Sequence, residues 1–333
     1  MRTQRAVVGA AVVAGMAATL LIQANTASAG DDVAVCFVPR GATVEQDRQV
    51  PAGKVDRLLR ETRSYLGPCA LYGDTVTIGG GRITAYTQAT KRDVPVSIGM
   101  VIPLATLGTL PPEPPNDGST CFDKNADGTV DPHTECAGGH SAPLRPHPRF
   151  LSTVDTRFTF LTINWNPSGH IPIGVYNVPH FDAHFYLVPD AERLAIDPGP
   201  CPQLVACDDY EVAKRPAAER YVAPGHVDVD AVEPRMGNHL INTSGPEFTG
   251  QPFTHTFIYG LNDARIMFYE PMITLAWLQG LVSGTTADGC VRPAQPAAWQ
   301  RSGWYPLTYC MRYRENRNEI TVSLENFVYR RAG

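Results

Sequence analysis

The stretch GHIPIGVYNVPHFDAHFYLVPD, residues 169–190, gathers histidines among aromatic and β-branched residues, with three of the chain's nine histidines in fifteen positions. The segment HFDAHFYLV is too rich in Phe, Tyr and Val to favour a helix, so it predicts a β-strand. Because side chains alternate between the two faces of a strand, His180, Asp182 and His184 share one face. An aspartate buried between two histidines must be satisfied. This face therefore predicts a polar site and not an ordinary apolar core.

Neighbours on that face lie roughly 6.6 Å apart, so Asp182 can share a metal ion with either histidine, whereas the two histidines lie about 13 Å apart. Other imidazole and carboxylate groups in apolar surroundings lie upstream and downstream in the chain. Together they suit zinc, iron or manganese. The alternative for any single histidine is a hydrogen-bonded strand residue, which is our interpretation of His255. The predicted metal site comprises His170, His180, Asp182, His184, His239 and Glu270.

A second candidate site lies in CFDKNADGTVDPHTEC, residues 121–136. Oxygen donors at positions 1, 3 and 5, with Gly128 at position 6, form the pattern that wraps calcium. The acid expected at position 12 comes one residue later, and no helices flank the loop, so a full EF-hand fits badly. The loop resembles a single calcium loop of thrombospondin-type and dockerin-type repeats, and a plain Asx-turn loop is the alternative. The predicted calcium ligands are Asp123, Asn125, Asp127, Thr129, Asp131 and Glu135.

The ends and the cysteines of the chain predict export. Arg2 and Arg5, an apolar run over residues 6–22 and the small residues Ala27 to Ala29 are typical of a cleaved signal peptide. The alternative is an uncleaved membrane anchor, for which the apolar run is short. The eight cysteines all follow that segment, and an even number in an exported chain predicts disulfides. We expect neighbours to pair, as Cys36–Cys69, Cys121–Cys136, Cys201–Cys207 and Cys290–Cys310.

Charge limits the classes of partner. Without Arg2 and Arg5, 26 basic residues stand against 33 acidic ones, a net charge of about −7. This argues against nucleic acid as a partner. After signal cleavage no membrane span is expected either. The expected partner is a metal ion or a small molecule, and a homo-oligomer stays open.

Strand signals dominate the rest of the chain, as in DTVTIGGGRITAYTQ and EITVSLENFVYR. Helix signals are confined to residues 52–67 and residues 271–284, with Pro271 in the first turn of the second helix. Many short strands with few helices predict an all-β fold, a β-barrel or a sandwich that could be cupin-like.

The chain divides into five segments, of which residues 30–333 are expected to form one compact domain. We expect residues 111–148, which hold eight prolines, to contain no strand. The segments are a signal peptide (1–29), an N-terminal β segment (30–110), a Pro-rich insertion with the calcium-type loop (111–148), a His-bearing β core (149–285) and a C-terminal β extension (286–333).

The segments WNPSGHIPIGVYNVPHFDAHFY, MGNHLIN and FTHTFIYGLNDARIMFYEPMIT resemble an uncharacterised family of exported bacterial proteins, of the kind first noted as sigma-E-regulated in thermophiles. The resemblance covers residues 70–110 and 150–280, and its PHFDxHFY and EPMIT motifs are the most specific. It implies a β-rich fold and the same His/Asp/Glu set, but no activity. An acidic residue usually follows the first histidine of this pattern, and here Ile171 stands in its place.

Three classes of function remain. The first is a secreted β-barrel protein that binds a metal ion or small ligand through the His/Asp/Glu pocket. The second is a cupin-like metal-dependent enzyme, which would need an open coordination position and a nearby acid or base. The third is a cell-surface structural protein in which the histidines only join strands.

Overall fold

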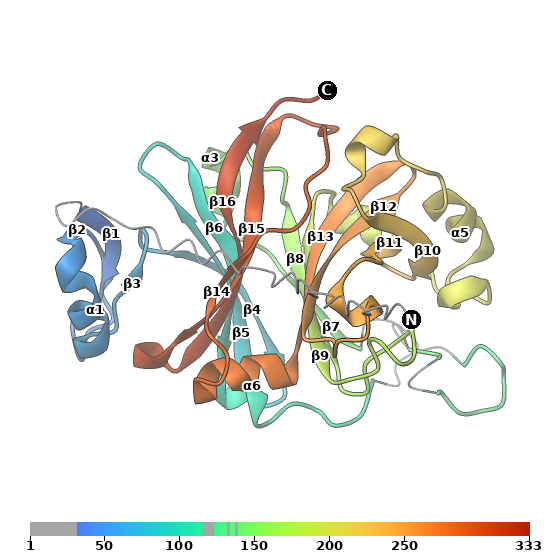
Figure 1. Ribbon diagram of the computed structural model, residues 1–333, viewed down its shortest axis with the longest axis horizontal. Helices are drawn as coiled ribbons and strands as arrows, with labels where there is room; N and C mark the ends of the chain where they lie inside the picture. The colour runs from blue at the N-terminus through green and yellow to red at the C-terminus, as the bar shows by residue number, and fades with distance from the viewer. Residues whose placement is uncertain (1–31, 116–122, 132–133, 137–138) are drawn as a thin grey trace, which may run out of the picture.

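The computed structural model describes residues 32–115, 123–131, 134–136 and 139–333, so the predicted signal peptide lies outside the described residues. The described chain forms three antiparallel sheets with six short α-helices (Figure 1). This confirms the predicted all-β class with a few short helices. Each sheet keeps two edge strands within the described ranges, so the β-barrel alternative is wrong. The two large sheets pack face to face as a sandwich.

A sheet of seven strands carries the predicted metal ligands. In spatial order its strands are β10 (His226–Glu233), β11 (Gly237–Asn242), β12 (His255–Asn262), β13 (Arg265–Thr274), β9 (His180–Tyr186), β8 (Phe160–Asn166) and β7 (His140–Leu144).

A sheet of six strands faces it and joins the two ends of the chain. Its strands lie in the order β14 (Gly289–Val291), β15 (Gly303–Arg314), β16 (Glu319–Arg330), β6 (Pro95–Pro103), β5 (Gly81–Ala89) and β4 (Leu71–Ile78). The pairing of β16 with β6 brings the last long strand against one from the first third of the sequence.

The main hydrophobic core lies between these two sheets, because every strand that contributes to it alternates apolar residues on that face. From β9 it takes Phe181, Ala183 and Phe185, each at most 1% exposed. The facing sheet contributes Met100 from β6 and Val322 from β16. The opposite face of β9 therefore points away from this core.

A second core covers that opposite face of the seven-stranded sheet. The segment between β9 and β10 folds over it and supplies Ile196 and Val205, which pack with Met272 from β13 and Tyr186 from β9. This segment contains α5 (Cys207–Ala213), which lies at the far right of the molecule in Figure 1. The seven-stranded sheet is thus buried on both faces, so its polar side chains are enclosed.

The helices are α1 (Ala52–Glu61), α2 (Leu104–Leu107), α3 (Pro148–Thr153), α4 (Asp190–Leu194), α5 and α6 (Leu275–Ser283), and the 3₁₀ turns are η1 (Pro202–Leu204), η2 (Glu219–Tyr221), η3 (Pro246–Phe248) and η4 (Glu315–Arg317). None of the helices in the described ranges is long and apolar enough to cross a membrane.

Both predicted helices exist, but their bounds were wrong. The first ends at Glu61, and Tyr65 and Leu66 form strand β3. The second begins at Leu275, because the Thr274 side chain accepts a hydrogen bond from Trp277 N at 3.2 Å and so caps it. Pro271, expected in the first helical turn, lies inside β13.

The expectation that residues 111–148 hold no strand was also wrong. Residues His140–Leu144 form β7 and pair with β8. Pro143 is compatible with this because β7 is an edge strand, where a missing N–H can face away from the sheet.

Three of the four predicted disulfides are confirmed. Cys36–Cys69, Cys201–Cys207 and Cys290–Cys310 are bonded. The fourth predicted pair, Cys121–Cys136, includes Cys121, which lies outside the described residues.

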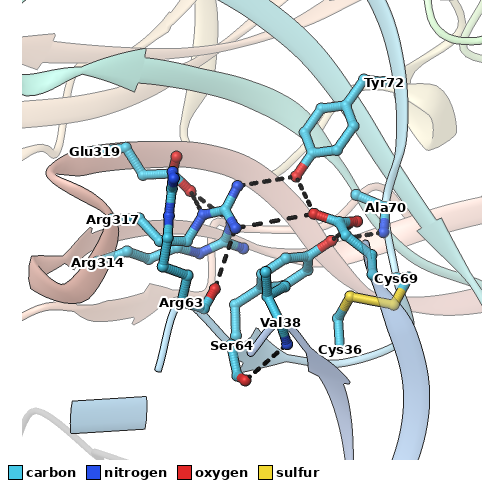
Figure 2. Close-up of polar contacts among 12 residues, drawn as sticks. Cys36, Val38, Arg63, Ser64, Cys69, Ala70, Tyr72, Arg314, Arg317 and Glu319 are labelled. Atoms are coloured by element: carbon cyan, nitrogen blue, oxygen red, sulfur yellow. Dashed lines mark hydrogen bonds and ion pairs between the residues drawn. A yellow bond between two sulfur atoms is a disulfide. The ribbon is translucent and has the colours of Figure 1, made fainter. Parts of the chain in front are cut away.

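A small sheet at the other end of the molecule, with β2 (Gln46–Pro51), β1 (Asp32–Phe37) and β3 (Tyr65–Leu66), docks on the six-stranded sheet with α1 (Figure 1). Figure 2 shows that Arg317 is the centre of this contact. Its guanidinium pairs with Glu319 at 2.8 Å and with Glu45 at 3.8 Å, and donates to Arg63 O at 3.1 Å. Tyr65 OH donates to Glu45 at 2.7 Å. One side chain therefore joins Glu319 of the six-stranded sheet to Glu45, the residue that precedes β2 of the small sheet.

We predict that Arg317→Ala weakens this docking. Glu45 would lose its cation and the buried Glu319 would keep only Arg314, so the free energy of unfolding should fall by about 2 kcal/mol, less than the 3–5 kcal/mol of a fully buried pair. Arg57→Ala, which breaks an exposed pair with Glu61, should cost less than about 0.5 kcal/mol. Urea unfolding followed by fluorescence measures both, and equal losses would contradict the docking role.

Candidate metal centre

Strand β9 places His180, Asp182 and His184 on the enclosed face of the seven-stranded sheet. All three are at most 2% exposed. The register of β13 against β9 pairs Met272 with Asp182 and Tyr269 with Phe185, which sets Glu270 opposite His184. Alternation along β9 and this register together concentrate acids and imidazoles inside the second core.

The six predicted ligands form two neighbouring groups. We call the first, His170, His180 and Asp182, the Asp182 group, and the second, His184, His239 and Glu270, the Glu270 group. Within each group, one potential ligand atom from every residue lies within 4.8 Å of the other two. Each group thus offers two imidazoles and one carboxylate.

In the Asp182 group, the two imidazoles approach different oxygens of one carboxylate. His180 Nε2 lies 3.1 Å from Asp182 Oδ1, and His170 Nε2 lies 3.6 Å from Asp182 Oδ2. Asn166 on β8 donates from Nδ2 to Asp182 Oδ2 at 2.6 Å, which restrains the orientation of the carboxylate.

Backbone carbonyls determine which imidazole nitrogen is free. His180 Nδ1 lies 2.7 Å from Val178 O, and His170 Nδ1 lies 2.7 Å from Ile171 O. A carbonyl only accepts, so Nδ1 carries the proton and Nε2 of the neutral ring is a lone pair. The lone pair of His170 faces Asp182 Oδ2, and that of His180 faces Asp182 Oδ1 and also lies 3.3 Å from the Asn166 Nδ2 donor. A lone pair and a carboxylate oxygen face each other favourably only with a proton or a metal cation between them.

In the Glu270 group, the same arrangement is more deeply buried. His184 Nε2 lies 3.4 Å from Glu270 Oε1, and His239 Nε2 lies 3.7 Å from Glu270 Oε2. His239 Nδ1 donates a hydrogen bond to Ala231 O at 3.0 Å. Both nitrogens of His184 and Oε2 of Glu270 are buried without a hydrogen-bond partner among the described residues.

Gly260 allows His239 to reach this group. It pairs with His239 on one side and with Phe268 on the other. A Cβ at Gly260 would lie 2.0 Å from the Phe268 ring, so only glycine lets that ring cross β12. Phe268 then packs edge-on against both His184 and His239, at centroid distances of 4.8 and 5.1 Å.

Burial and charge give the two groups different protonation. Burial lowers the pKa of His184 to about 3 and that of His239 to about 4, so both rings are neutral at pH 7. Burial, together with the charges of Asp182 and Glu233, raises the pKa of Glu270 well above its usual range. Burial also opposes the charge on Asp182, but the neighbouring histidines outweigh it and lower the pKa of Asp182.

The distances in the Glu270 group fit a shared ion better than a shared proton. Two atoms each about 2.1 Å from a metal lie about 3.0 Å apart at a right angle and about 3.4 Å apart at the tetrahedral angle. The separation of 3.4 Å lies at the upper end of that range, the separation of 3.7 Å lies just above it, and both exceed the usual length of a hydrogen bond. Neutral imidazoles beside a carboxylate are the donors that divalent transition metals prefer.

A cavity of about 280 Å³ borders both groups. His170 and Asp182 from one group, and His239 and Glu270 from the other, line it. A metal held by three protein ligands could therefore keep a coordination position open toward this cavity, as catalytic and ligand-binding sites do.

The sequence interpretation missed Glu233 and Asn166. Glu233, at the end of β10, lines the same cavity, and burial raises its pKa to about 8. Asn166 holds Asp182. Its signal was available, because Thr162, Asn164 and Asn166 alternate along β8 and face His184, Asp182 and His180 in register.

Two histidines outside the two groups, His226 and His255, have ordinary hydrogen-bond partners. His255 Nδ1 lies 2.7 Å from Tyr309 OH, and His226 Nε2 lies 3.0 Å from Phe257 O. This matches the interpretation of His255 as a hydrogen-bonded strand residue.

The calcium-type loop is organised by its own side chains. Asp123 accepts from the backbone N–H groups of Asp127 and Gly128, and Asp127 accepts from Thr129 N. Glu135 is 4% exposed, and its carboxylate accepts three backbone N–H groups, from Lys124, Asn125 and Asp131. Among the described residues, no three acids of the loop bring their carboxylate oxygens within 4.8 Å of one another. Glu135 stabilises the loop backbone through its hydrogen bonds, and calcium binding stays a prediction.

Compared with protein-family models, with curated proteins and with solved structures, the chain shows no match. The resemblance to an exported bacterial family therefore stays an expectation, and function must be argued from the site.

Proposed function

We propose that this protein is a secreted metal-binding protein that holds a divalent transition metal, zinc, iron or manganese, in the Glu270 group and the Asp182 group. The Glu270 group carries the proposal. Three buried side chains converge there, and two of them, His184 and Glu270, have buried atoms without a hydrogen-bond partner among the described residues, which is costly for an acid. A cation between them removes that cost.

Binding is favoured over a purely structural role by the same observation. Histidines that only join strands would have their nitrogens satisfied, as His226 and His255 do. His184 has neither nitrogen paired within the described chain. The open cavity beside both groups further supports a protein that presents its metal to a ligand.

Export is supported by the three disulfides, which are typical of proteins outside the cytoplasm. The signal-like residues 1–29 point the same way. A metal-dependent enzyme is the alternative. Such an enzyme would need a general acid or base beside the metal, and Glu233, which lines the same cavity, is the candidate for that role.

We predict that tag-free protein, stripped with a chelator and dialysed against Zn²⁺, takes up two equivalents, measured by elemental analysis. Asp182→Asn and Glu270→Gln should each remove one equivalent, with at least about 100-fold weaker binding at the altered group, because an amide is a poor substitute for a charged ligand. His255→Gln, which changes a half-buried histidine outside both groups, should bind as the wild type does. Uptake of no zinc, or unchanged uptake by both ligand variants, would reject the proposal.

We also propose that the loop from Asp123 to Glu135 binds calcium in a structural role. Asp123, Asn125 and Asp127 already fold over the loop backbone, as hard-oxygen ligands must.

Calcium should then raise the melting temperature. At a concentration 100 times the dissociation constant, it should add about 2.7 kcal/mol to the free energy of unfolding. Asp127→Ala should abolish this shift, whereas Asp56→Ala, an exposed acid on α1, should keep it. Differential scanning calorimetry with and without millimolar calcium measures the shift, and identical curves for the wild type would refute calcium binding.

A further inference from the structure

The residues that line the cavity beside the two groups are apolar, apart from members of those groups, Glu233 and Tyr176. Its floor is formed by strands of the seven-stranded sheet, with Ile258 and Met272 at most 2% exposed. Its cover comes from Ile171 and Pro172 before β9 and from Phe248 in η3. A ligand that enters would meet metal and carboxylates on one side and hydrocarbon on the others.

The edge of the cavity is apolar as well. Val229 on the edge strand β10 lines the cavity and is 42% exposed, so it marks the point where the cavity reaches solvent. Ile173, the residue after the lining residue Pro172, is 56% exposed. Exposed aliphatic side chains beside a cavity that is itself apolar mark a site for apolar ligands.

Charge sets the head group of such a ligand. Each group has one carboxylate and two imidazoles, and an imidazole ligates a metal in its neutral form, so a divalent ion bound in either group would leave a net charge of about +1. A metal with an open position then attracts an anionic oxygen donor. The surrounding hydrocarbon excludes water and strengthens that attraction.

Size limits the rest of the molecule. A volume of about 280 Å³ holds roughly ten non-hydrogen atoms, if each takes the roughly 30 Å³ of a water molecule. The cavity is too small for a long lipid chain or a folded peptide.

We propose that the cavity, where the Asp182 and Glu270 groups meet an apolar wall with an aliphatic rim, binds a small amphiphilic acid: an aliphatic or aromatic body of about eight carbons with an anionic oxygen head that ligates the metal. This inference rests on the proposed metal binding. It adds the chemical class of the ligand.

The probe is octanoate, which has ten non-hydrogen atoms. Calorimetric titration of the zinc-loaded protein should show octanoate binding at least about ten-fold more tightly than acetate, because each buried methylene is worth about four-fold in affinity. Octanoate should also bind at least about ten-fold more tightly than 1-octanol, which has the same chain but no charge. The chelator-stripped protein should lose this preference for the acid.

Matched variants on β10 test the location. Val229→Gln should reduce octanoate affinity about three-fold or more while acetate binding stays unchanged, because it places an amide at the apolar rim. Val227→Gln alters an equally exposed valine, at 43%, that does not line the cavity, and should bind both probes as the wild type does.

The outcomes separate the two proposals. If the protein takes up no metal, the proposed function fails and this inference fails with it. If metal binds but octanoate is no tighter than acetate, or if 1-octanol binds as tightly as octanoate, the ligand class is wrong and metal binding stands. If the two valine variants changed octanoate affinity equally, octanoate would not bind at the cavity rim that Val229 forms.

Discussion

Three of the four imidazoles in the two groups donate a hydrogen bond from Nδ1 to a backbone carbonyl, and that constraint determines what the rest of the site can do. For His170, His180 and His239 the remaining nitrogen is a lone pair directed at a carboxylate. Carboxylate and lone pair repel each other unless a proton or a metal cation lies between them. The arrangement occurs in both groups, so each group needs a shared proton or a bound cation, and the separations in the Glu270 group favour the cation.

The architecture provides the enclosure that this arrangement needs. The seven-stranded sheet buries one face against the six-stranded sheet and the other under the segment between β9 and β10. Because the second face is covered, Glu270 is only 1% exposed, and burial, together with the charges of Asp182 and Glu233, raises its pKa. The same cover leaves a cavity with an apolar wall next to the ligands. Enclosure therefore has two consequences, strong metal–ligand electrostatics and a preference for ligands with hydrocarbon.

The sequence predicts which ligands share a strand face, because the alternation of side chains along a strand is a local property of the backbone. The pattern HFDAHFY alone sets His180, Asp182 and His184 on one face, and the structure has them there. Three disulfides followed from pairing neighbours along the chain. The division of the six ligands into two groups did not follow, since it depends on the register between β9 and β13, which no local pattern fixes. The start of α6 was missed for a similar reason, because Thr274 can either continue a strand or cap a helix, and tertiary pairing with β9 decides.

X-ray absorption at the zinc edge tests directly whether two imidazoles and a carboxylate of each group hold a metal ion. With one zinc equivalent bound, we predict nitrogen and oxygen neighbours at about 2.0–2.1 Å, with the outer-shell scattering of two imidazoles for each ion. In the Glu270→Gln variant the signal should report the Asp182 group alone. A first shell of sulfur, a shell of oxygen without imidazole scattering, or a metal signal unchanged when Asp182 and Glu270 are both replaced would contradict it.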